Sequence, residues 1–510
     1  MHGRYAYGAI GVLILARVFS IDARGLAVLR MAVAVIGLLD LALRLPDLAD
    51  HFTDRGTLTR TDALQWFRGY HDWTISLHLI GGSLWSQIAL FSLHAAALLA
   101  LLLGWRTRAA SVVAWLMVLS LTVRNPYLSY GGDILLRSLL FWLMLVPAGR
   151  AWSLDARAGD ATHRACSTIA CAGLLLQVWL VLFMAGLPKL GTDVWQQGLG
   201  LAYALDQEET TRPLGWIVRD FPALTRAMSH ATLVVELGVS SLLWLPVPAI
   251  RFVAIAVWWA LLLGITATID VHLLPALTAA GMVVFVPPSA WDVVERRLPS
   301  FAGGSATGAP QQARPAVDAA PARTAGEWAT QAVAAFAMVY LVIWNIGLWR
   351  SGEAYEPPAA VAWFGRAAMM RQSWGMFSDF TRTGWFTAPG TLADGRRVDL
   401  LAAGGPVPAL EDALAAAETQ GRPADVRSRY RDTHWLALFK ILRQFSHQDG
   451  HFLHYGRYLC REWNRGRPGP EQLLGFEIVF VGRDVGAHLQ RRPVMADYER
   501  TLLWTHDCFQ

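Results

Sequence analysis

The sequence predicts an all-α polytopic membrane bundle of about nine transmembrane helices, followed by a small α+β extramembrane domain. Of its 510 residues 54% are hydrophobic and 16% are charged, and the mean hydropathy is +0.34. A chain this apolar is not an ordinary soluble domain. The apolar residues gather into long stretches, and the composition turns water-soluble after Trp349. We therefore expect the lipid bilayer to be the main partner of this chain.

The charge of the chain argues against nucleic acid as a partner. The formal net charge is +5, and no block of Lys and Arg interleaves with exposed aromatic residues. A nucleic-acid-binding surface usually needs such a basic patch. The 23 Trp instead favour a membrane protein, because the amphipathic indole ring prefers the membrane interface.

Nine apolar stretches define the expected bundle. Several are shorter than the ~20 residues of a spanning helix, so their ends must include flanking residues or the bilayer must thin locally. A shorter segment, Gly8 to Ser20, is expected to lie on the membrane surface. The nine stretches are 28–45, 84–103, 109–123, 133–147, 166–187, 230–247, 251–268, 271–287 and 329–347.

Domain boundaries follow from these stretches. The segment from 301 is rich in Gly, Ala and Pro and has little that forms a core, which is typical of a flexible linker. We expect an N-terminal surface helix (1–27), a transmembrane domain (28–300), the linker (301–328), the last transmembrane helix (329–347) and an extracytoplasmic α+β domain (348–510).

Basic residues predict the orientation of this multi-pass cell-membrane protein, because Lys and Arg in short loops stay on the cytoplasmic side. They occur at the N-terminus, at 104–108, after 147, at Arg251 and at Arg296 and Arg297, which are alternate loops. The N-terminus is then cytoplasmic and the region after 348 extracytoplasmic. The loops at 46–83, 124–132 and 188–229 are expected to face the C-terminal domain.

The C-terminal region shows both strand and helix patterns. Residues 374–401 alternate and break at Gly390 and at the Asp394-Gly395 turn, as a β-hairpin does. Helical patterns follow near 408–420 and 423–463, and a last strand is expected near 475–481.

The four cysteines predict no metal site. Cys166 and Cys171 begin the fifth apolar stretch, and we expect both to be small buried hydrophobic side chains. Cys460 and Cys508 lie in the external domain, where a disulfide and two free thiols are both open. No Cys/His spacing is typical of zinc.

Lys189 is the leading candidate for a catalytic residue. It lies in the run FMAGLPKLGTDVW, where the chain leaves the fifth apolar stretch. A lysine held in apolar surroundings can lose its proton and act as a base. The alternative is a lysine that reaches the membrane interface at a helix end without any chemical role.

Other polar residues interrupt the apolar stretches, and burying an ionisable group in a membrane is costly. They are candidates either for interhelical pairs, such as Arg137 with Glu236, or for the lining of a hydrated cavity. Asp133, Asp270, His272 and Lys189 are expected near one face, which favours the cavity. The residues in question are Asp40, His94, Asp133, Arg137, Glu236, Asp270 and His272.

At these residues the chain also resembles a known family. The runs at 30–60, at 124–141 (RNPYLSYGGDILLRSLLF) with WSLD after it, and at 185–198 (AGLPKLGTDVWQQG) are similar to the HTTM domain. That is the membrane domain shared with vitamin K-dependent gamma-carboxylase. The WGMFS, GTLADGRRVDL and LCREWN runs resemble the extramembrane region of bacterial members. The resemblance covers most of the chain.

This resemblance implies a function for several residues. Lys189 matches the lysine that is taken to deprotonate reduced vitamin K, and Asn125 matches a carboxylase asparagine. By the same resemblance, the cofactor is reduced vitamin K or menaquinol, and no metal is expected. Trp195 and its aromatic neighbours then pack the quinol ring, with Asp133, Arg137, Glu236, Asp270 and His272 as further binding candidates. The expected activity is a quinol-dependent oxygenase or carboxylase.

The sequence also departs from the carboxylase. A functional histidine beside the asparagine is replaced here by Pro126 and Tyr127, so carboxylation of peptide glutamate is left open. Two hypotheses remain. One is a quinol-dependent enzyme with Lys189 as its base. The other is a non-catalytic maturation or immunity factor that binds a secreted peptide through its external domain.

Overall fold

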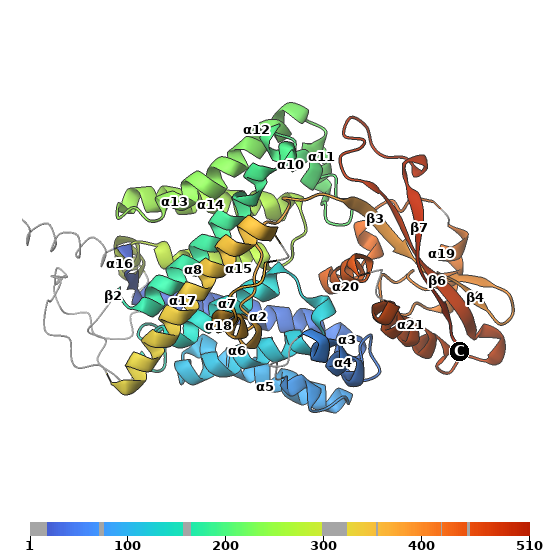
Figure 1. Ribbon diagram of the computed structural model, residues 1–510, viewed down its shortest axis with the longest axis horizontal. Helices are drawn as coiled ribbons and strands as arrows, with labels where there is room; N and C mark the ends of the chain where they lie inside the picture. Colours follow the sequence, from blue (N-terminus) through green and yellow to red (C-terminus); the bar gives the residue numbers. More distant parts are fainter. Residues whose placement is uncertain are drawn as a thin grey trace, which may run out of the picture.

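The computed structural model describes residues 18–70, 76–156, 165–297, 324–352, 355–419, 421–445 and 449–509. Figure 1 shows a helical bundle, coloured blue to yellow, with the α+β domain in orange and red at one end. Most of the expected surface helix at Gly8 to Ser20, and most of the expected linker at 301–328, lie outside the described residues.

All nine apolar stretches contain helix. The main helices of the bundle are α2 (Ala23–Arg44), α5 (Leu84–Leu103), α6 (Thr107–Arg124), α7 (Gly131–Leu145), α8 (Ile169–Gly186), α12 (Pro222–Leu233), α13 (Ser240–Leu242), α14 (Pro248–Thr268), α15 (Leu274–Met282) and α17 (Ala325–Ser351). A π-helical turn, η6 (Val234–Val239), joins α12 to α13.

Only some of these helices are long and apolar enough to cross a membrane. Within the described ranges six pass this test, or seven if α15 with the short helix η7 (Val283–Phe285) is combined with α16 (Pro288–Arg297), from which it bends by 101°. The count of nine transmembrane helices is therefore not confirmed. The 15 residues of α7 reach only about 22 Å at 1.5 Å per residue, less than the ~30 Å hydrocarbon core. This helix is nevertheless deeply buried, so the protein itself surrounds it.

Local signals explain where several helices begin and end. Asp22 caps α2 by accepting a hydrogen bond from the backbone of Arg24, so the helix begins before the predicted residue 28. Thr324 and Glu327 form a capping box that begins α17. Gly104 takes a left-handed conformation, with φ of 66°, in the tight turn between α5 and α6.

Short elements occupy the end of the bundle that carries the C-terminal domain. The loops predicted to face that domain, 46–83, 124–132 and 188–229, do contact it: Arg431 pairs with Asp47 and the Tyr127 hydroxyl bonds His451. The short helices here are η1 (Leu45–Asp47), α3 (Leu48–Phe52), α4 (Arg60–Tyr70), η2 (Leu77–Leu79), η3 (Pro126–Leu128), η5 (Pro188–Gly191), α9 (Asp193–Gln196), α10 (Gly200–Ala204) and α11 (Pro213–Arg219).

The C-terminal domain combines a five-stranded antiparallel sheet with helices. Strand β6 (Leu473–Asp484) pairs with β7 (Glu499–Asp507) along one edge and with β3 (Arg382–Thr387) and β4 (Pro389–Leu392) along the other, and β5 (Arg397–Asp399) extends the sheet beyond β4. The predicted hairpin at Asp394-Gly395 is the β4–β5 turn. The helices are α18 (Ala359–Ala367), which packs on α17, α19 (Leu410–Glu418), α20 (Thr433–Gln444) and α21 (Asp449–Asn464). Helix α20 lies between the sheet and the bundle (Figure 1).

A buried cluster of charges joins the sheet to the bundle. Arg483 on β6 contacts Asp206 at 2.7 Å and Glu208 at 2.8 Å, both on the segment after α10. Arg219 reaches the same Asp206 at 2.7 Å, and Tyr498 donates a hydrogen bond to Glu208. Burial, and then the Glu208 carboxylate, raise the pKa of the Tyr498 phenol, which therefore remains a donor.

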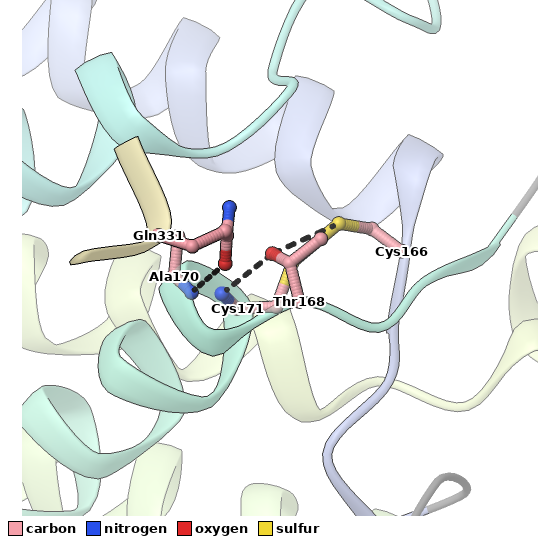
Figure 2. Close-up of a disulfide and its surroundings, with 5 residues drawn as sticks. All are labelled: Cys166, Thr168, Ala170, Cys171 and Gln331. Atoms are coloured by element: carbon pink, nitrogen blue, oxygen red, sulfur yellow. Dashed lines mark hydrogen bonds between the residues drawn. A yellow bond between two sulfur atoms is a disulfide. The ribbon is translucent and has the colours of Figure 1, made fainter. Parts of the chain in front are cut away.

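The cysteines pair at opposite ends of the molecule. Cys460 on α21 is bridged to Cys508, which ties that helix to the end of β7. Cys166 and Cys171 are both buried, as expected, but the structure also pairs them in a disulfide, which was not predicted. Cys166 lies in β2 (Ala165–Cys166), which pairs with β1 (Ile21–Asp22), and the chain turns at Thr168 to place Cys171 in the first turn of α8. Figure 2 shows Thr168 accepting the Cys171 amide and Gln331 of α17 accepting the Ala170 amide.

Replacing Arg483 by Ala should strongly destabilise the junction of the two domains. Removing one partner from a buried ion pair leaves uncompensated charge, which costs about 3 to 5 kcal/mol. We expect a lower unfolding midpoint in detergent and faster proteolysis between the domains. The control is Arg491→Ala, which removes an exposed pair with Asp497 in the same domain. Equal effects of the two substitutions would contradict the assignment of Arg483 as the docking residue.

Candidate active site at the domain junction

Lys189 is buried in the short helix η5 that follows α8. Pro188 begins η5, and its fixed φ suits the first turn of a helix. Only 4% of the Lys189 side chain is exposed, so it does not extend freely toward the membrane interface. Its ammonium group lies 2.6 Å from Oε1 of Glu236 and 4.6 Å from the centre of the Trp195 ring. Both contacts stabilise a positive charge in a site that is otherwise apolar.

Glu236 comes from the π-helical turn between α12 and α13. A π-turn inserts one extra residue per turn and often occurs at functional sites. Oε1 of this carboxylate accepts the Lys189 hydrogen bond, while Oε2 has no hydrogen-bond partner among the described residues. The close approach depends on Gly186 of α8, where an added Cβ would lie 2.8 Å from Cβ of Glu236.

Trp195 connects this pair to the C-terminal region. Its indole Nε1 donates a 2.6 Å hydrogen bond to the carbonyl of Phe377, in the WGMFS segment (residues 374–378). An added Cβ at Gly375 would lie 3.2 Å from Pro188, so the same segment packs against η5. The WGMFS segment therefore covers the Lys189 site from the side of the C-terminal domain.

A second polar cluster forms around Arg44, at the end of α2. Its guanidinium contacts Asp40 at 2.8 Å and Asp133 at 2.6 Å, and all three side chains are buried. Asp133 also accepts the Tyr130 amide at the start of α7, which fixes the orientation of the carboxylate. A small cavity of about 10 Å³, about the size of one water site, adjoins this cluster.

Asp270 and His272 lie beside a much larger cavity at the domain junction. The cavity has a volume of about 560 Å³ and is lined by residues of both the bundle and the C-terminal domain. Asp270 pairs with Arg212 at 3.3 Å and with Arg427 at 3.5 Å, so it bridges the two domains. The His272 ring stacks on Tyr130, with centroids 5.2 Å apart.

Asn125 and Arg137 have structural contacts, whereas both ring nitrogens of the buried His94 have no hydrogen-bond partner among the described residues. Asn125 ends α6 and donates from Nδ2 to the carbonyl of His51 at 3.0 Å. Arg137 donates to the carbonyl of Met369 at 2.9 Å and is therefore not the partner of Glu236. The suggested Arg137–Glu236 pair is wrong, because Glu236 pairs with Lys189 of η5, the short helix that follows α8.

The expected convergence of four groups on one cavity is only partly found. Asp270 and His272 line the large cavity, Asp133 lines the small one, and Lys189 belongs to a separate cluster with Glu236 and Trp195. The sequence analysis did not single out Arg44, Tyr130 or His434 as site residues. His434 is brought to Asp40 by α20, and residues so far apart in the chain carry no local spacing signal.

The composition of the chain sets Lys189 apart from most of its other cations. The chain contains 42 arginines and only two lysines, Lys189 and Lys440. Arginine is always protonated in proteins, whereas a lysine amine can exchange its proton. Lys189 and Lys440 therefore differ from the arginines of the chain in carrying an exchangeable proton.

The fold and these clusters define a multi-pass membrane protein whose buried polar groups gather where an α+β domain docks. The sequence model of the HTTM domain family matches residues 20–291, which is just over half of the chain. The protein belongs to the HTTM domain family. No curated protein and no solved structure matches the chain.

Replacing Gly186 by Ala should push η6 away from α8. The new Cβ would meet Cβ of Glu236 at 2.8 Å and Leu237 at 3.0 Å, and such overpacking costs about 1 to 3 kcal/mol. Thermal unfolding of the purified protein should show a lower midpoint. The matched control is Gly238→Ala in the same π-turn, where an added Cβ meets no atom within 4 Å. A Gly186→Ala variant as stable as Gly238→Ala would refute the close approach.

Proposed function

We propose that Lys189 and Glu236 accept a proton from a lipophilic hydroquinone, for which menaquinol and reduced vitamin K are the candidates. The observation that carries this proposal is the buried 2.6 Å lysine–glutamate pair beside Trp195, with Oε2 of Glu236 left unpartnered among the described residues. Membership of the HTTM family, which includes carboxylase-like membrane proteins, supports the same proposed reaction.

The proton balance of this step is simple. The ion pair holds one proton, which resides on Lys189 or is transferred to Oε1 of Glu236. After that transfer, a hydroquinone hydroxyl donates its own proton to the neutral lysine amine. The pair gains one positive charge and the quinol becomes a singly charged anion. The lysine ammonium can then stabilise that anion electrostatically in an apolar site.

The surroundings of the pair fit an aromatic substrate. The Trp195 ring lies beside the amine, with its centre 4.6 Å from Nζ of Lys189. Gly191 and Gly238 are exposed, and added Cβ atoms there would meet no atom within 4 Å, so η5 and η6 are open to the outside of the protein at these positions. Leu190, between Lys189 and Gly191, is 46% exposed, which suits entry of a lipophilic molecule from the bilayer.

The pair can be tested by replacing the lysine with arginine. Lys189→Arg retains a cation that can bind Glu236 but cannot give up its proton. We expect Lys189→Arg and Glu236→Gln to lose at least about 100-fold in turnover, as is usual when a general base is removed. The assay is oxidation of reduced menaquinone or vitamin K to quinone or epoxide by protein in nanodiscs, with oxygen and bicarbonate.

The control for this assay is Lys440→Arg, which alters the only other lysine, a half-exposed one near Glu209. It should retain full turnover. An active Lys189→Arg variant would show that position 189 needs only a positive charge. If the wild-type protein is inactive under all of these conditions, the proposal of a quinol-dependent enzyme is refuted.

We also infer that the C-terminal domain is extracytoplasmic and that the N-terminus is cytoplasmic. The inference rests on the arginines in alternate loops of the sequence, among them Arg296 on α16, at the end of the bundle away from that domain. Figure 1 places β2 and α16 at this opposite end.

Single cysteines introduced in loops 124–132 and 188–229 test this orientation. All four native cysteines are paired, so background labelling of intact cells should be low. A membrane-impermeant maleimide added outside should label exposed positions in 188–229, such as Leu214. Labelling that requires access from the cytoplasm would reverse the orientation.

A second candidate function is a non-catalytic factor that binds a secreted peptide. The observation that favours it is the 560 Å³ cavity between the two domains, which is rich in charged side chains. Peptides could reach this cavity without entering the bilayer. Tight binding of a secreted peptide, reduced by Arg427→Ala and without any quinol turnover, would support this function over the first.

A further inference from the structure

We infer that Asp40, His272 and His434 bind a divalent first-row transition metal ion, of which zinc and ferrous iron best fit the donors. The three residues come from α2, from the turn before α15 and from α20 of the C-terminal domain. Their ligand atoms lie within 4.8 Å of one another. Two imidazole nitrogens and one carboxylate oxygen form a donor set that such ions use in proteins.

The orientation of His434 is the first observation behind this site. The side chain is 2% exposed, and its Nε2 has no hydrogen-bond partner among the described residues. This nitrogen faces Oδ1 of Asp40 at 3.9 Å. The other ring nitrogen, Nδ1, lies 3.8 Å from the Asp432 carboxylate. A carboxylate behind one ring nitrogen commonly orients a histidine so that the other nitrogen can bind a metal.

His272 completes the set from the other side. Its ring centre lies 5.4 Å from that of His434, and its stacking on Tyr130 restricts the plane of the ring. Metal–nitrogen and metal–oxygen bonds of about 2.0 to 2.2 Å require the ligand atoms to come closer together than they are here. His272 is half-buried in a turn and is therefore the ligand most able to move by about an ångström.

The charge of the cluster suits a cation. Asp40 and Asp133 share Arg44, so the three side chains together carry one net negative charge. Arg44 donates from Nε to Oδ2 of Asp40 at 2.8 Å, and its Nη2 donates to Oδ1 over a longer distance, 3.2 Å. Oδ1, which faces His434, is therefore the oxygen that can bind the ion.

Three protein ligands leave at least one coordination position for water or a substrate. Such an open position is typical of catalytic rather than structural metal sites. His272 also lines the 560 Å³ cavity, together with Asp432 and Thr433, so the open position would face that cavity. This inference does not depend on the function proposed for Lys189, which belongs to a different cluster.

Metal binding by the full-length protein tests the inference directly. Chelator-treated protein in nanodiscs would be titrated with Co²⁺, followed by its visible absorption, and with Zn²⁺, followed by calorimetry. We expect one ion per chain and a visible Co²⁺ band typical of nitrogen and oxygen ligands. His434→Ala and His272→Ala should each weaken metal binding about 100-fold or more. Loss of a residue that only supports a metal ligand costs about 10- to 100-fold, and loss of the ligand itself should cost at least as much.

His454→Ala is the matched control, because His454 is also in the C-terminal domain but contacts Asp62 instead. It should bind the ion as the wild type does. If His434→Ala fails to fold, His272→Ala in the turn decides the matter. No binding at 100-fold excess of Co²⁺ and Zn²⁺, or binding that both histidine variants retain, would overturn the site.

Discussion

The buried contacts of Arg483 with Asp206 and Glu208 hold the two parts of this protein together. Two carboxylates cannot remain buried at one point without a cation, and Arg483 on β6 and Arg219 on α11 supply that charge from both sides. The bundle and the sheet are therefore each incomplete alone at this point. The position of the C-terminal domain on the bundle follows from this requirement.

That position in turn determines what surrounds the polar groups of the bundle. The WGMFS segment accepts the Trp195 hydrogen bond and packs on Pro188, so it closes the Lys189 site. Helix α20 brings His434 to Asp40, and Arg427 reaches Asp270. Each candidate site thus combines residues of the bundle with residues of the C-terminal region that lie more than a hundred positions away in the chain.

Much of the fold could be predicted because its signals are local. The apolar stretches predicted the helices, and the Asp394-Gly395 turn predicted the β4–β5 hairpin. The contact between Trp195 and Lys189 is also local, because only one turn of chain separates the two residues. The number of membrane spans could not be fixed in this way. A buried helix such as α7 is as apolar as a spanning one, and only its length and surroundings distinguish the two.

The pairings of buried charges could not be predicted, since a charge in an apolar stretch requires a partner but does not specify it. Glu236 pairs with Lys189 rather than with Arg137, because Gly186 and the π-turn bring α8 and η6 together. The Cys166–Cys171 pair depends on the turn at Thr168. The approach of His434 to Asp40 depends on the docking of α20 against the bundle. Strand β7 was not predicted, because its sequence alternates only weakly between apolar and polar residues. It forms through pairing with β6, and that pairing leaves no local signal in the sequence of β7.

The central claim is that the bundle and the C-terminal domain form one cooperative unit whose sites need both parts. Scanning calorimetry of the intact protein in nanodiscs tests this claim most directly. The account predicts a single unfolding transition, since the buried charges cannot be separated without exposing both parts. Two well-resolved transitions in the wild-type protein, with the sheet unfolding while the bundle remains folded, would contradict it.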